Sequence, residues 1–209
     1  MTISRELLEC SSELWPRVYG HPFVRAVADG SLDDDAFARW VAADHFFNVE
    51  YQRFIAGLVA TAPTPRSVEV MSVGLASIQT GLDRIRRVAA RFDLDLDVDP
   101  GPTTVGFTSY LQSRLLLGWE VGLAALYASE KVYFDAWSSI RPAARRDTPY
   151  WPMAGVWSDE IFGHWISAVC RQVDLACLEG PTPAMHLAFD RVVRFELLFW
   201  TALYTGETW

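Results

Sequence analysis

The sequence lacks the features that mark secreted, membrane-spanning or zinc-dependent proteins. Its 209 residues hold three cysteines, Cys10, Cys170 and Cys177, and this odd, widely spaced set predicts neither a disulfide framework nor a CxxC zinc site. No uncharged apolar run approaches the roughly 18 residues of a membrane span, and the first residues show no basic segment followed by an apolar one. We therefore expect a cytoplasmic chain that does not enter a membrane.

Positive charge is also scarce. The chain has 18 Lys and Arg against 26 Asp and Glu, a formal net charge of −8. Such a chain lacks the electrostatic footprint of a nucleic-acid or anionic-membrane partner, so we expect neither. The one basic cluster places Arg84, Arg87 and Arg91 on a single face of a predicted helix. That pattern is typical of a solvated face or of a contact between subunits.

Strand patterns are nearly absent, and apolar residues recur with the helical period instead. We expect Pro16 to kink the first helix, and Ser31 with Asp34 to form a capping box. Without a repeat or a long linker, residues 1–209 are predicted to form one all-α domain, an array of about seven or eight helices. Proline and glycine divide the chain into helices at about 3–19, 22–28, from the Ser31 turn to 60, 66–92, 103–116, 119–140, 148–178 and 183–204.

Three carboxylates, Asp44, Glu130 and Glu196, occupy helix faces that should point into the core. A projection at about 100° per residue flanks each with aromatic and aliphatic side chains. Because an unpaired buried charge is costly, each acid can be a separate structural residue paired with Arg or Tyr. The other interpretation is convergence on one cavity, where perturbed carboxyl groups serve as acid, base or cation anchor. Three such acids on three helices favour that shared pocket.

Other chemistries find little support. A di-iron carboxylate bundle needs Glu-x-x-His pairs, but the residues three after the acids are Phe47, Tyr133 and Phe199. The acidic stretch 93–102 lacks the spacing of a calcium-binding EF-hand. No Ser-His-Asp elbow, phosphate loop or dinucleotide fingerprint is present. Haem on a single histidine stays an open alternative. An acidic, aromatic pocket favours a small, flat ligand that is cationic or amidine-like.

At these residues the sequence resembles the TenA family, the thiaminase II proteins of thiamine salvage. The resemblance runs over about residues 12–205 and rests on the order and spacing of short motifs. These are Trp15 with HPF at 21–23, DGSLD at 29–33, FARWVAAD at 37–44, FTSYL at 107–111, AALYASEKVY at 124–133, WSDEIF at 157–162 and FELLFW at 195–200.

The resemblance implies a haem-oxygenase-like helical fold, no metal or organic cofactor, and a homo-oligomer, either dimer or tetramer. The implied reaction is hydrolysis at an aminopyrimidine, which releases an amine from a thiamine breakdown product. Asp44 matches the family's acid that hydrogen-bonds the aminopyrimidine. Tyr133 matches its pocket tyrosine, and Glu196 matches its glutamate for proton transfer.

The chain also departs from the better-studied branch of that family. Ser129 stands where that branch has a nucleophilic cysteine, and a serine without an evident base is a poor nucleophile. Phe107 and Trp157 replace two pocket tyrosines. Glu130 fits a second branch, which lacks the cysteine. We expect Glu196, Glu130 and Ser129 at the catalytic centre, and a substrate-binding wall of Asp44, Phe47, Tyr51, Phe107, Tyr133 and Trp157.

The leading hypothesis is a hydrolase for aminomethyl- or formylaminomethyl-pyrimidine, a small-molecule pyrimidine ligand. Two nearby carboxylates should raise the pKa of one of them toward neutrality, the condition that a general acid needs. Two alternatives stay open. One is a divergent enzyme on the same fold that acts on another heterocycle or a quinone-like precursor. The other is a non-catalytic pyrimidine-binding protein.

Overall fold

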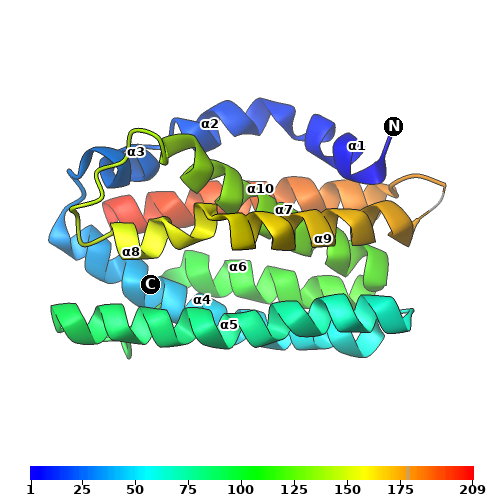
Figure 1. Ribbon diagram of the computed structural model, residues 1–209, viewed down its shortest axis with the longest axis horizontal. Helices are drawn as coiled ribbons and strands as arrows, with labels where there is room; N and C mark the ends of the chain where they lie inside the picture. Colours follow the sequence, from blue (N-terminus) through cyan, green and yellow to red (C-terminus); the bar gives the residue numbers. More distant parts are fainter. Residues whose placement is uncertain (178) are drawn as a thin grey trace.

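The computed structural model describes residues 1–177 and 179–209, and this part of the chain is helical without a strand. Figure 1 shows the longer helices α5, α9 and α10 lying along the long axis of the molecule, with α1, α2 and α3 across one side. The helices are α1 (Ile3–Cys10), α2 (Trp15–Tyr19), α3 (Pro22–Asp29), α4 (Asp34–Thr61), α5 (Pro65–Phe92), α6 (Gly101–Arg114), α7 (Trp119–Ile140), α8 (Trp151–Ala154), α9 (Glu160–Ala176) and α10 (Pro183–Thr205).

The packing places α7 at the centre of the array. This helix lies against both α10 and α9, while α4 packs along α5 and α6 contacts α4 and α10. Nearly the whole of α7 is buried, which explains its almost continuous apolar sequence. Trp40 of α4 stacks on Trp137 of α7 with ring centroids 5.2 Å apart, and both are fully buried. These contacts hold the inward faces of α4, α7 and α10 toward one another.

The all-α prediction is confirmed, although the described residues contain ten α-helices rather than seven or eight. The number is higher because two of the predicted long helices are each divided into two shorter ones. None of the helices in the described part of the chain is long and apolar enough to span a bilayer.

The first predicted helix, 3–19, is in fact α1, a 3-10 turn at Ser12–Leu14 and α2. The break falls at Ser11, and Pro16 sits in the first turn of α2. Proline is favoured there because the amide hydrogen that it lacks has no helical partner at that position. Pro16 therefore starts a helix and does not kink one.

The predicted helix 148–178 is also divided, into α8, a 3-10 turn at Val156–Ser158 and α9, and residue 178 lies outside the described residues. Asp159 is extended (φ −84°, ψ 173°), and its side chain accepts a hydrogen bond of 2.8 Å from the Phe162 amide. This N-cap begins α9 and leaves Trp157 in the preceding turn.

The N-terminal cap of α4 is Asp33 rather than Ser31. The Asp33 carboxylate accepts a 2.7 Å hydrogen bond from the amide of Ala36, in the first turn of the helix. Ser31 lies outside the helix, and its amide bonds the Asp29 side chain. The predicted capping box is therefore wrong by two residues, because several Asp and Ser residues compete at this turn.

The cap assignment predicts a stability difference. Asp33→Ala should lower the free energy of unfolding by about 1 kcal/mol, since the first-turn amides of α4 lose their carboxylate acceptor. Ser31→Ala is the matched control and should change it by less than about half that amount. Urea unfolding followed by circular dichroism measures both. An equal or larger loss in Ser31→Ala would contradict the assignment.

Candidate active site

One cavity of about 370 Å³ gathers all the residues that the sequence nominated. Asp44, Glu130 and Glu196 line it together, on α4, α7 and α10. The structure therefore favours the shared pocket over three separate structural acids. Ser129 and the six predicted wall residues line the same cavity: Asp44, Phe47, Tyr51, Phe107, Tyr133 and Trp157.

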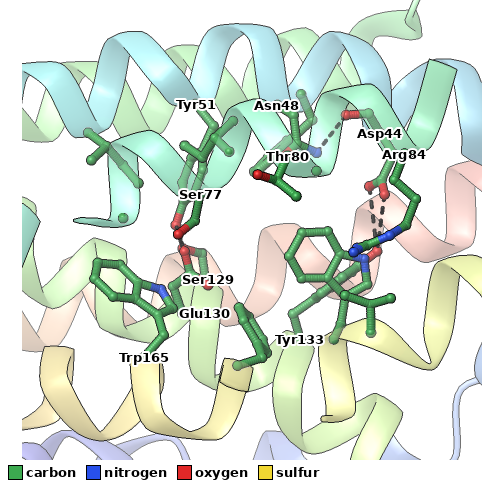
Figure 2. Close-up of a pocket in the computed structure, with 18 of the residues that line it drawn as sticks. Asp44, Asn48, Tyr51, Ser77, Thr80, Arg84, Ser129, Glu130, Tyr133 and Trp165 are labelled. Carbon is green, nitrogen blue, oxygen red and sulfur yellow. Dashed lines mark hydrogen bonds between the residues drawn. The ribbon is translucent and has the colours of Figure 1, made fainter. Parts of the chain in front are cut away.

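The cavity opens between α5 and the start of α9. Ser77 and Thr80 line it from α5 and are exposed, and Ile161 lines it from α9 with 79% of its surface exposed. Figure 2 shows two groups of polar side chains inside, one around Asp44 and Tyr133, the other around Tyr51, Ser129 and Glu130.

The first polar group is built around Asp44. The Tyr133 hydroxyl donates toward its two carboxyl oxygens at 3.5 and 3.4 Å, and the Trp40 indole N–H donates to that hydroxyl at 3.4 Å. Asn48 donates to the Asp44 backbone carbonyl at 2.8 Å. Burial raises the pKa of Asp44 to about 7, and the Tyr133 hydrogen bond offsets part of that rise. Near neutral pH this carboxyl group can either donate or accept a hydrogen bond.

The second group joins α4 to α7. The Tyr51 hydroxyl lies 2.7 Å from Ser129 Oγ and 3.0 Å from Glu130 Oε1, while Ser129 Oγ donates to the Leu126 carbonyl at 3.0 Å. Burial raises the pKa of Glu130 to about 7, opposed by Tyr51 and then by the Trp165 indole, which Figure 2 shows beside it. The pocket thus holds a second carboxyl group that titrates near neutrality.

Glu196 differs from the other two acids because its carboxyl group has no hydrogen-bond partner within the described residues. Burial raises its pKa well above the usual value, and the charges of Asp44 and Glu130 add to the effect. The pKa of Glu196 thus moves upward as expected for one of several neighbouring carboxyl groups, but burial is the main cause and like charge comes second. A partnerless carboxyl facing a cavity is free to bond a ligand.

Aromatic rings form the walls. Phe47 lies between Tyr51 and Phe107, with ring centroids 5.3 and 5.1 Å away. Elsewhere in the lining, the Trp157 ring meets Tyr133 edge-on, with ring centroids 5.7 Å apart. Flat, apolar walls with a few polar groups are typical of sites for small planar ligands.

Sequence reasoning missed the α5 side of the pocket. Gly74, Ser77 and Gly81 share one face of α5 and line the cavity, and their spacing of three and four residues was the available signal. Arg84 follows on the same face and also lines the cavity while staying partly exposed, a position that the expectation of a solvated face or subunit contact did not include. The missed wall residues from α9 and α10 are Ile161, Phe162, Trp165 and Phe199.

The fold and the site together define a class of protein: an all-helical array with one acidic, aromatic cavity among its described residues. Residues 11–206 match the family model described as TENA/THI-4/PQQC, and the chain belongs to this family.

Named relatives extend the comparison. The chain is 24% identical to an aminopyrimidine aminohydrolase of Halalkalibacterium halodurans, over 100% of this chain and 98% of that protein. The solved structure of a TenA homologue from Pyrococcus furiosus superposes with a TM-score of 0.90 at 26% identity, covering 97% and 100% of the two chains. A domain from Shewanella denitrificans with a haem-oxygenase-like fold gives 0.75 at 14% identity, covering 96% and 91%. The predicted fold class is confirmed.

The raised pKa values predict a pH-dependent stability. Asp44 and Glu130 have folded pKa values of about 7 against reference values of 3.8 and 4.5. Because the folded state then binds more protons than the unfolded state, stability should fall as pH rises from about 4 to about 7. Urea unfolding across this range should show a smaller fall in Glu130→Gln than in the natural protein. A steeper fall in the variant would contradict the burial of this acid.

The same glycine-to-alanine substitution should affect stability differently at two positions of α5, Gly74 and Gly81. A Cβ at Gly74 would lie 2.7 Å from Cζ2 of Trp165, whereas a Cβ at Gly81 would lie 3.6 Å from Trp157, an ordinary contact. Gly81→Ala should be neutral or stabilise α5 by up to about 1 kcal/mol. Gly74→Ala should destabilise by about 1–3 kcal/mol, because the indole must move. Thermal and urea unfolding measure both, and equal effects would contradict the close approach.

Proposed function

We propose that the protein hydrolyses an aminopyrimidine, an aminomethyl- or formylaminomethyl-pyrimidine from thiamine breakdown, as part of pyrimidine salvage. The observation that carries the proposal is the convergence of three carboxyl groups with raised pKa values in one aromatic cavity. Membership of the family and relatives named aminopyrimidine aminohydrolase support it.

Asp44 is the ligand anchor in this proposal. An aminopyrimidine presents a ring nitrogen acceptor beside an amino donor, and a carboxyl group that both donates and accepts complements this edge. Tyr133 orients Asp44 through its hydroxyl. Phe47, Phe107 and Trp157, which all line the cavity, provide faces for the flat ring.

Glu196 is the proton-transfer group. Water attacks the exocyclic carbon, so a C–O bond forms while the C–N bond to the amine breaks. Glu196 accepts the proton that water loses and returns a proton to the departing nitrogen. Its raised pKa and its partnerless carboxyl suit both steps. Glu130 is the second acid of the pocket.

We propose in addition a cytoplasmic homo-oligomer, on the strength of the family resemblance. The apolar pattern of residues 66–92 does not by itself supply the subunit contact. Met71, Ile78 and Leu82 are buried within this chain, whereas Val73 remains 63% exposed. An interface on α5 would therefore use a different face from the one that carries most of the apolar residues.

Turnover of aminopyrimidine, formylaminopyrimidine and thiamine tests the proposed reaction. The natural protein should release amine from at least one of them. Glu196→Gln should lower kcat by about 10²–10⁴-fold, since it removes the acid/base group. Asp44→Asn should act mainly on KM, because it alters the edge that holds the ring. Chromatography of the hydroxymethylpyrimidine product and an ammonia assay give both constants.

Asp190→Asn is the matched control, an acid of the same helix that bonds Arg194 outside the pocket, and it should leave both constants unchanged. Full turnover by Glu196→Gln would remove this residue from the reaction. A well-folded protein that turned over none of the three compounds would favour a divergent enzyme on this fold. Tight pyrimidine binding in calorimetry without product would instead identify a binding protein.

A further inference from the structure

The hydrogen bonds around Ser129 need more hydrogens than the two hydroxyl groups supply. Three contacts form a row: Glu130 Oε1 to the Tyr51 hydroxyl at 3.0 Å, Tyr51 to Ser129 Oγ at 2.7 Å, and Ser129 Oγ to the Leu126 carbonyl at 3.0 Å. Each contact requires one hydrogen between its two oxygens. Tyr51 and Ser129 contribute one each, and the Leu126 carbonyl contributes none.

A proton on Glu130 completes the row. Glu130 then donates to Tyr51, Tyr51 donates to Ser129, and Ser129 donates to the Leu126 carbonyl, so that all three contacts are hydrogen bonds running in one direction. With Glu130 ionised, Tyr51 turns its hydrogen to the carboxylate. Ser129 then has one hydrogen for two acceptors, and one contact in this buried site is left without a hydrogen bond, which is unfavourable.

We propose that Ser129, by accepting the hydrogen that Tyr51 would otherwise give to the carboxylate, keeps a proton on Glu130, and that Ser129 serves in this row as an acceptor and not as a nucleophile. In the complete row the Ser129 hydrogen is directed at a backbone carbonyl, and no base receives it. Glu130 is consequently the proton donor of the pocket, and the row of hydrogen bonds keeps it protonated. Tyr51 and Ser129 are positioning residues that act through it.

The role of Glu130 in catalysis rests on the proposed hydrolysis. There, water forms the new C–O bond directly, the C–N bond breaks, and the proton of Glu130 passes to the departing amine nitrogen. Glu196 takes the proton from the attacking water. Two carboxyl groups thus carry out the two proton transfers that Glu196 alone would otherwise carry out one after the other. No covalent bond to Ser129 forms.

Two substitutions should move the pKa of Glu130 in opposite directions. In Ser129→Ala, the Tyr51 hydrogen loses its acceptor and is left for the carboxylate, so the ionised form gains and the pKa falls. In Tyr51→Phe, the carboxylate loses its donor and the pKa rises. Each shift should be about one pH unit, the size of one ordinary hydrogen bond. Hydroxyl groups with a purely structural role would not shift the pKa of Glu130 in opposite directions.

Other ionisable groups also act on Glu130, and the experiment must hold them constant. Asp44 and Tyr51 face the cavity from α4, Arg84 from α5, Tyr133 from α7, Asp159 from the turn before α9, and Glu196 from α10. Only the hydroxyl groups change in the two variants. A Glu130→Gln variant identifies the signal of this one carboxyl group among them.

Infrared titration of the ligand-free protein measures the proton on Glu130 directly, without substrate. The protonated-carboxyl band that is missing in Glu130→Gln is followed from pH 5 to 9 in Ser129→Ala and Tyr51→Phe. Tyr127→Phe and Ser139→Ala are the matched controls on α7. Tyr127 is buried outside the pocket, and Ser139 makes the same bond to a carbonyl three residues back, at 2.7 Å. Neither control should move the band.

Kinetics give the second readout. Ser129→Ala should keep turnover within about tenfold, with the alkaline limb of its kcat profile displaced to lower pH, whereas loss of a nucleophile costs about a thousandfold or more. Shifts of equal sign in the two variants, or a thousandfold loss with no shift, would overturn the proposal. If the natural protein were inactive on every pyrimidine, only the proposed function would be refuted. The infrared titration would still decide in which direction the hydrogen bonds of the row run.

Discussion

Desolvation of carboxyl groups is the constraint on which the site depends. Asp44, Glu130 and Glu196 lie in one cavity whose walls are mostly aromatic, and burial is the first cause of the raised pKa of each. Three full charges in such a place would repel one another and lose most of their hydration. Protonation of some of them reduces both costs: a neutral carboxyl group retains a hydrogen to donate, and one that is still ionised can accept a proton. The chemistry proposed for the pocket follows from this electrostatic condition.

The surrounding helices maintain that condition. Asp44 and Glu130 each form a hydrogen bond with a tyrosine hydroxyl, while the Glu196 carboxyl group makes no hydrogen bond within the described residues. The three acids are therefore chemically distinct even though burial acts on all of them. Gly74 lets the Trp165 ring, which lines the cavity, approach α5 closely. The packing of the helices around the cavity therefore also determines the acid–base behaviour of its carboxyl groups.

Much of the site was predictable because helices have a fixed period. Position along a helix determines the direction of a side chain relative to its own axis, so Asp44, Glu130 and Glu196 were recognisable as inward acids. The caps were less predictable, since Ser31, Asp33 and Asp34 all favour a helix start and only local backbone geometry decides among them. The place of Arg84 beside the cavity was not predictable, because its helical face says nothing about which helix lies opposite.

The sequence by itself determined an all-helical chain and the inward faces of α4, α7 and α10, and the family resemblance implied that Ser129 stands where another branch has a nucleophilic cysteine. Tertiary structure decided that Tyr51, 78 residues away in sequence, would meet Ser129 and Glu130 and connect them in one row. It also decided that α5 and α9 would close the cavity. Helical periodicity orients side chains about one axis, whereas the partner across the cavity depends on how separate helices pack. The hydrogen count that assigns Ser129 its role exists only in the folded protein.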